Sequence, residues 1–151
     1  MSQVAYLPVV DVIEKVLYEQ LDLFEFQVRD TSEMGPAEGL TCPNGNFIRI
    51  REDVYQSACD GGQRARFTLC HELGHYFLHT NQLLARLAPN EQIKPYRSAE
   101  CQANRFASTL LMPEPLVRKY SSIQEIADNF GVSKSAAKIK MSLLGMGTTS
   151  F

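Results

Sequence analysis

The stretch His71-Glu72-Leu73-Gly74-His75 constrains the fold more than any other part of the 151-residue sequence, because its chemistry requires a helix. Two histidines four residues apart lie about 40° apart around an α-helix, so both imidazoles can bind one tetrahedral zinc ion. Glu72 lies about 100° from His71, where its carboxylate can accept a proton from an activated water without being a ligand. The spacing predicts zinc ligands at His71 and His75 and a general base at Glu72. The alternative for so short a motif is a helix with two core histidines.

The residues around the motif favour the metal site. The chain has three histidines, all on one face of a helix predicted from Gln63 to His79: His71, His75 and His79. Phe67, Thr68 and Leu78 fall on the same face, which we expect to pack inward as a largely apolar stripe. A metal ion would satisfy imidazoles that are otherwise costly to bury there. His79 lies too far along the helix axis to join the same tetrahedral ion, so we expect it to hydrogen-bond beside the site.

A catalytic zinc needs a third protein ligand and one open position. The leading candidate is Glu100 on a helix predicted from Ser98 to Met112, whose alanines let it lie close to the motif helix. Asn104, one turn after Glu100, can accept the free ring N–H of a zinc-bound histidine and fix its tautomer. A third histidine six residues after His75 is excluded because residue 81 is asparagine. The alternative for Glu100 is a solvated carboxylate at a helix start.

The remaining pattern predicts an α+β fold with helices packed on a small antiparallel sheet. Apolar spacing over residues 8–21 is typical of a helix, and the alternation over residues 24–28 of a strand. Two further strands flank Asn44-Gly45, which predicts a hairpin whose outer strand can pair with an extended peptide. Residues 32–39 are expected to form a loop, and Asp53 to cap a short helix ending at Gly61-Gly62. Residues 80–97 are predicted to be an irregular lid or cleft wall, or disordered.

The C-terminal part, residues 113–151, is predicted to be a helical subdomain beside a metallopeptidase core of residues 1–112, or to pack with it as one domain. A short helix is expected over residues 113–120; Ser122 and Glu125 have capping-box spacing, and Ser133 can cap a second helix to about Leu144. The positions of Ala127, Gly131 and Ile139 suggest a helix-turn-helix-like arrangement.

DNA binding by this subdomain is the less favoured interpretation. Lys134, Lys138 and Lys140 can meet phosphates, but Glu125 and Asp128 reduce the local positive charge. The second helix also has no arginine, the side chain that most often reads bases. A packing or substrate-docking role is favoured instead.

The composition does not favour binding to nucleic acid or to a membrane surface, because 15 basic and 17 acidic residues leave a net charge of -2. No apolar run reaches the length of a membrane span and no signal peptide is evident, so a cytoplasmic protein is expected. Its four cysteines, which lack disulfide-framework or Cys-x-x-Cys spacing, are expected to be reduced. Cys70 and Cys101 flank the proposed ligands, and we interpret both as small buried packing residues.

The motif region resembles the ImmA/IrrE family of zinc metallopeptidases. The resemblance covers roughly residues 40–145 and rests on four separated blocks: Arg66-Phe67-Thr68, His71 to His79, Glu100-x-x-Ala103-Asn104-x-Phe106-Ala107, and Leu110-Leu111-Met112-Pro113. It implies a gluzincin-like, zincin-type core, His71, His75 and Glu100 as zinc ligands, and Glu72 as general base. Family members of known function cleave, or trigger cleavage of, transcriptional repressors encoded nearby, often in mobile elements or stress responses.

Two functions therefore follow from the sequence. The first is a zinc endopeptidase, an anti-repressor protease acting on a helix-turn-helix repressor, with Tyr96, Arg97 or His79 as candidate oxyanion partners. The alternative is a regulator that binds DNA or a repressor and carries a structural or sensory metal. Glu72→Gln separates them, since it abolishes proteolysis but leaves binding unaffected.

Overall fold

The computed structural model describes residues 6–80 and 95–147, with the side chains of residues 95–97 outside the description. The described part contains a three-stranded sheet and a series of helices. In chain order the elements are α1 (Val9–Asp11), η2 (Val12–Gln20), β1 (Glu25–Arg29), α2 (Thr31–Met34), β2 (Gly39–Thr41), β3 (Phe47–Arg51), α3 (Glu52–Cys59), α4 (Gln63–His79), α5 (Pro95–Leu111), α6 (Glu114–Val117), α7 (Ile123–Phe130) and α8 (Lys134–Leu143). The α+β class is confirmed.

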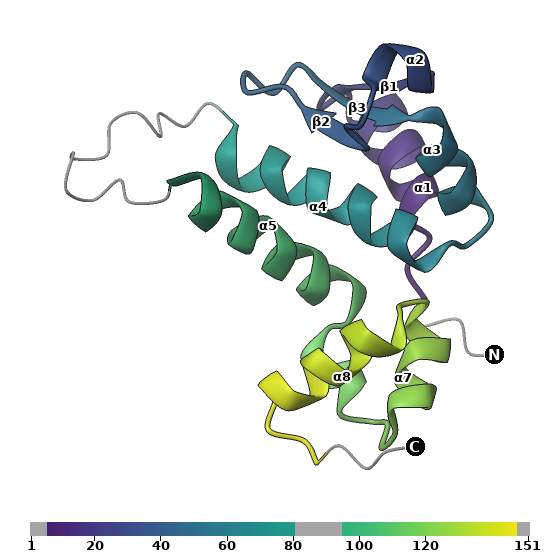
Figure 1. Ribbon diagram of the computed structural model, residues 1–151, viewed down its shortest axis with the longest axis vertical. Coiled ribbons are helices and arrows are strands. Elements are labelled where there is room, and N and C mark those ends of the chain that lie inside the picture. Colours follow the sequence, from purple (N-terminus) through teal and green to yellow (C-terminus); the bar gives the residue numbers. More distant parts are fainter. Residues whose placement is uncertain (1–5, 81–94, 148–151) are drawn as a thin grey trace.

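Helix α4 occupies the centre of the molecule, between the sheet with α1 and α3 on one side and α5 on the other (Figure 1). Its predicted bounds, Gln63 to His79, are those observed. The buried residues of α4 include Ala65, Leu69, Cys70 and Leu73, which belong to the hydrophobic core. The face with Phe67, Thr68 and Leu78 is only partly buried, so the prediction that it packs inward is wrong. The side of α4 that faces the core is instead the one with Ala65, Leu69, Cys70 and Leu73.

Helices α4 and α5 lie unusually close together at Gly74. A Cβ atom at this position would be 3.0 Å from the Cα and 3.1 Å from the carbonyl oxygen of Ala103. The expectation that the alanines of the Glu100 helix let it lie close to the motif helix is therefore confirmed at Ala103. It positions α5 so that its side chains reach those of the motif helix.

The sheet has the strand order β1-β3-β2 and is mixed rather than antiparallel. The predicted hairpin is confirmed, since β2 pairs antiparallel with β3. Strand β1, however, pairs parallel with β3, with Phe26 opposite Ile48. The prediction of an antiparallel sheet is wrong because the alternation of apolar residues in β1 fixes which face is buried but carries no information about strand direction.

Three local predictions also differ from the structure. The first helix continues from α1 into η2, whose wider π-type winding is shown by the hydrogen bond from Leu21 N to Val16 O, 2.9 Å long. The predicted loop 32–39 begins inside α2, where the Asp30 carboxylate accepts a hydrogen bond from the Glu33 amide. Asp53 lies in the first turn of α3 and does not cap it, because its carboxylate instead pairs with Arg51.

The C-terminal helices have the predicted caps. Ser122 and Glu125 form a capping box at the start of α7, Gly131 ends that helix in the left-handed conformation with φ 67°, and Ser133 caps α8. Two residues of α8 differ from the helix-turn-helix interpretation. Lys140 is only 8% exposed, which leaves it little surface to offer a phosphate, and Ile139 is 60% exposed.

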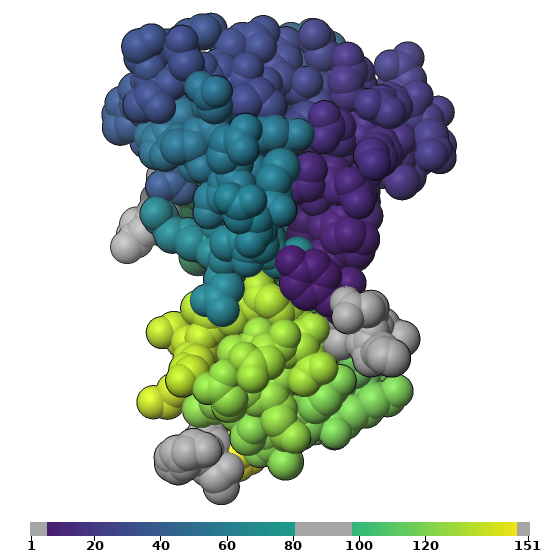
Figure 2. Space-filling view, turned by 90° about the vertical axis from the view of Figure 1, so that its right-hand side faces the viewer, coloured from purple at the N-terminus to yellow at the C-terminus, as the bar shows by residue number. Residues whose placement is uncertain are grey.

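The buried guanidinium of Arg66 joins the core to the C-terminal helices. It donates hydrogen bonds to the carbonyl oxygens of Leu7 (2.6 Å), Phe130 (3.0 Å) and Gly131 (3.2 Å). The Tyr6 ring lies against the plane of the guanidinium, with Arg66 Cζ 4.0 Å from the ring centroid. Figure 2 shows the C-terminal helices as a lobe that meets the N-terminal residues and the start of α4 at a narrow waist. A domain boundary at residue 112 remains a prediction.

No helix in the described part of the chain is long and apolar enough to cross a membrane.

All four cysteines are unbridged, as expected. The packing interpretation is right for Cys70, which is buried, and wrong for Cys101, which is exposed. Burial raises the pKa of the Cys70 thiol to about 12, so it remains protonated at neutral pH. The predicted lid lies mostly outside the described residues.

Candidate metal centre

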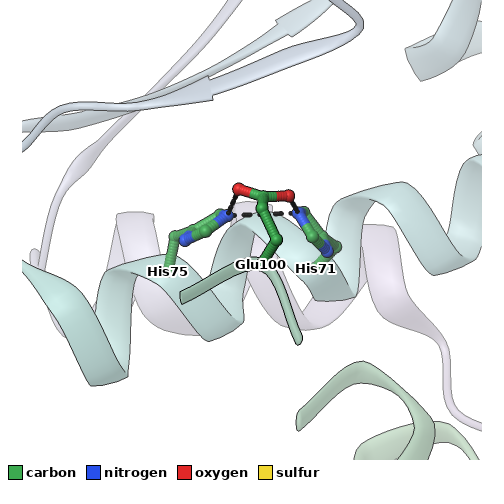
Figure 3. Close-up of side chains that lie close together, drawn as sticks. All are labelled: His71, His75 and Glu100. Carbon is green, nitrogen blue, oxygen red and sulfur yellow. Dashed lines mark hydrogen bonds and ion pairs between the residues drawn. The ribbon is translucent and has the colours of Figure 1, made fainter. Parts of the chain in front are cut away.

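His71, His75 and Glu100 converge between α4 and α5. The two Nε2 atoms are 3.1 Å apart, and the Glu100 carboxylate places Oε1 3.0 Å from His71 Nε2 and Oε2 2.9 Å from His75 Nε2. Figure 3 shows one carboxylate oxygen directed at each imidazole. The three ligand atoms lie within 4.8 Å of one another, so the group can hold a metal ion. The structure thus brings together the three residues that the sequence placed at the site.

The outer nitrogen of His71 is held by Asn104. The Asn104 amide oxygen lies 2.7 Å from His71 Nδ1 and can only accept, so Nδ1 carries the proton. The lone pair of His71 is then on Nε2, the atom that faces Glu100. Asn104 therefore has the contact expected of it from the sequence.

The outer nitrogen of His75 is held by a chain of two side chains. His79 Nε2 lies 2.8 Å from the amide oxygen of Gln102, so it donates there and leaves its Nδ1 as an acceptor. His75 Nδ1, 3.1 Å from His79 Nδ1, is the donor to that acceptor. The lone pair of His75 also lies on Nε2. His79 contacts the site as expected, whereas Gln102 was missed, since an exposed glutamine on a helix gives no sequence signal.

This donor set fits a divalent cation. Two neutral imidazoles present their lone pairs to the same point as a carboxylate, which is a ligand combination typical of zinc sites with an open position. Burial holds the pKa of His75 below its usual value, and the neighbouring His71 and His79 act in the same direction while Glu100 opposes them. A lowered pKa favours the neutral imidazole that a metal requires.

Glu72 is buried beside this group, with 7% of its surface exposed. Burial raises the pKa of its carboxyl group, and a hydrogen bond donated by the Thr41 hydroxyl to Oε1 partly opposes that shift. Gly39 makes room for the side chain, since a Cβ there would lie 2.8 Å from Glu72 Cγ. Thr41 and Gly39 belong to β2, and sequence reasoning missed both. Their proximity depends on how the sheet packs on α4.

The oxyanion candidates are not resolved by the geometry. Tyr96 and Arg97 belong to α5, but their side chains lie outside the described residues. His79 is engaged with His75 and Gln102. No oxyanion residue is assigned from the part of the chain that the structure covers.

A His-Glu-x-x-His helix whose histidines meet a glutamate from a second helix defines a metallopeptidase class of site. The chain belongs to the peptidase family Peptidase_M78, since the family model described as an IrrE N-terminal-like domain matches residues 19–142. It is also similar to the metallopeptidase ImmA of Bacillus subtilis (strain 168), with 26% identity over 140 residues that cover 85% of this chain and 76% of that protein. The protein is a metallopeptidase.

Proposed function

We propose that the protein is a zinc-dependent endopeptidase with His71, His75 and Glu100 as metal ligands. The observation that carries the proposal is the convergence of these three side chains, together with the buried Glu72 carboxylate on α4, the helix that carries both histidines. Zinc is the proposed ion because two imidazole nitrogens and one carboxylate suit it. When bound, it supplies a Lewis acid that polarises the scissile carbonyl and makes a water molecule acidic.

The side chains of this protein then have separate tasks. Glu72 accepts a proton from the attacking water as that water adds to the carbonyl carbon, and later gives the proton to the departing amine. A pKa raised by burial brings the carboxylate closer to the value at which both transfers are efficient. Asn104 and His79 keep the two imidazoles in the tautomer that leaves Nε2 free.

The proposed substrate is a transcriptional repressor of the helix-turn-helix type, encoded near this gene, as in an anti-repressor protease. The support is the resemblance to the ImmA/IrrE family. A repressor substrate would place the reaction in the cytoplasm. Binding of DNA by α8 is not proposed, because Lys140 is buried and the helix presents the apolar Ile139 and Leu143 at its surface.

The test is Glu72→Gln, compared with the wild type after both are loaded with zinc. We expect the variant to retain one equivalent of zinc by metal analysis and to lose cleavage of the neighbouring repressor by at least about 100-fold, the usual contribution of a general base. His75→Ala should lose both the metal and the activity. Full activity in the Glu72→Gln protein would refute the proposal.

A further inference from the structure

A groove runs along α4 from the candidate active site toward the start of that helix. Its volume is about 640 Å³, and its floor is one face of α4, which includes Phe67, His71 and Glu72. One wall comes from Glu38 and Gly39 at the start of β2. The opposite wall comes from the turn between α7 and α8 and from α8 itself, with Val132, Ser133, Ala136 and Ile139. Residues far apart in the sequence therefore build one groove, and it contains the proposed general base.

The wall contributed by α8 is apolar. Ile139 is 60% exposed although it is a large hydrophobic residue, and Ala136 precedes it by three positions on the same helix. A second hollow of about 620 Å³ on the α5 side shares Phe67, Asn104, Ala136 and Ile139 with the groove, which places Ile139 on the ridge between the two. Figure 1 shows how α8 comes to lie below the start of α4 and beside the end of α5. An exposed apolar ridge beside a catalytic group suggests a binding role.

The charges around the groove do not favour an anionic ligand. Among the described residues that line the groove, Arg64 carries the positive charge. It forms an ion pair with Glu38, with Nη2 2.9 Å from Oε2. Lys140, the residue after Ile139 on α8, is buried and does not line the groove. The groove thus offers apolar surface rather than positive charge next to Glu72.

We propose that this groove binds the polypeptide substrate next to the scissile bond and selects a large apolar side chain there, with Ile139 of α8 as the specificity-determining residue. The inference rests on the proposed peptidase function. Successive side chains of an extended peptide are spaced by about 3.3 Å. A substrate whose carbonyl is attacked beside Glu72 therefore brings a neighbouring side chain to the groove. The helix-turn-helix-like pair in this protein forms a wall of the active-site groove.

The experiment is cleavage-site profiling with a peptide library made by digesting a bacterial proteome. Zinc-loaded wild type, Ile139→Glu and Ile139→Lys are each incubated with the library, and Glu72→Gln provides the background. Ser142→Glu is the matched control, because Ser142 is also exposed on α8 but does not line the groove. Thermal unfolding of each variant verifies the fold, which an exposed position should tolerate.

We expect the wild type and Ser142→Glu to enrich large apolar residues at one position beside the cleaved bonds. At that position Ile139→Glu should favour basic and Ile139→Lys acidic side chains, with kcat/KM for the apolar peptides reduced by at least about 10-fold. Unchanged profiles in both Ile139 variants, with cleavage intact, would overturn this inference and leave the proposed peptidase function standing. Wild-type cleavage no greater than that of Glu72→Gln would contradict both.

Discussion

Both candidate zinc-binding imidazoles have their outer nitrogen held by another side chain, so the ligand atoms are oriented before a metal arrives. The Asn104 contact with His71 is the simpler of the two, since one amide oxygen accepts one ring proton. Loss of such an orienting contact typically lowers metal affinity by 10- to 100-fold.

We therefore predict that Asn104→Ala lowers zinc affinity by about 10- to 100-fold. The physical reason is that His71 loses the acceptor that fixes its tautomer and ring orientation. Competition with a chromophoric chelator measures the change. Asn104→Asp keeps an acceptor at the same place and should retain most of the affinity; equal losses in the two variants would contradict an orienting role.

Gly39 gives a second prediction at the residue scale. Gly39→Ala puts a methyl group 2.8 Å from Glu72 Cγ, so the carboxylate is displaced while the proposed ligands His71, His75 and Glu100 are untouched. We expect kcat to fall by about 100-fold, as a displacement of about 1 Å can produce, with zinc content unchanged. Gly147→Ala, where a Cβ meets nothing within 4 Å, should behave as the wild type in the same assay.

The site residues that the sequence predicted are those whose spacing along a helix indicates their role. His71, Glu72 and His75 lie on one helix, and Glu100 and Asn104 on a second, so the helical period fixes the angles between the residues of each set. Thr41 and Gly39 lie on a strand and Gln102 is an exposed residue of α5, and no period links any of them to the motif. Their contacts depend on tertiary packing.

The elements that carry the site are α4 and α5, and their close packing depends on Gly74 facing Ala103. This contact was predictable, because a glycine inside a helix costs about 1 kcal/mol and implies a compensating approach. The bounds of α4 also followed from its apolar pattern and the preceding glycines. The direction of β1 did not, because a two-residue alternation is the same when read in either direction.

Gly74→Ala tests the packing of these two helices. Alanine improves intrinsic helix propensity, but its Cβ would lie 3.0 Å from a backbone atom of Ala103, and backbone cannot easily give way. We expect a net loss of about 1–3 kcal/mol in the free energy of unfolding, as overpacking typically costs. Denaturant unfolding measures it. Zinc affinity should fall as well, because Glu100 moves with α5; a more stable variant would contradict the close approach.

At the scale of the whole molecule, Arg66 connects three segments that are distant in the sequence. Its guanidinium is 2% exposed and satisfies carbonyl oxygens before α1 and at the end of α7. The sequence marked Arg66 only through the family resemblance, because nothing local predicts which carbonyls a buried arginine will reach. The connection keeps α8 beside α4, where the groove is formed.

We predict that Arg66→Met destabilises the protein by about 3 kcal/mol, because one buried and two partly buried carbonyl groups lose a donor, at about 1–3 kcal/mol for each fully buried group. Hydrogen exchange should show the largest loss of protection in α7 and α8. Arg66→Lys keeps the charge but cannot reach three acceptors at once, so only partial rescue is expected. Uniform loss of protection across α4 and the sheet would argue against a connecting role.

Metal removal tests the centre and the fold together. The proposed ligands come from α4 and α5, so a bound ion stabilises the folded state by RT ln(1 + [M]/Kd), about 4 kcal/mol when the free ion is at 1,000 times Kd. We expect a chelator to lower the thermal midpoint of the wild type by several degrees and restored zinc to reverse the change. Glu100→Gln weakens the metal site by removing its carboxylate, so its midpoint should respond much less to either addition. An equal response in the two proteins would place the stabilising metal somewhere other than between α4 and α5.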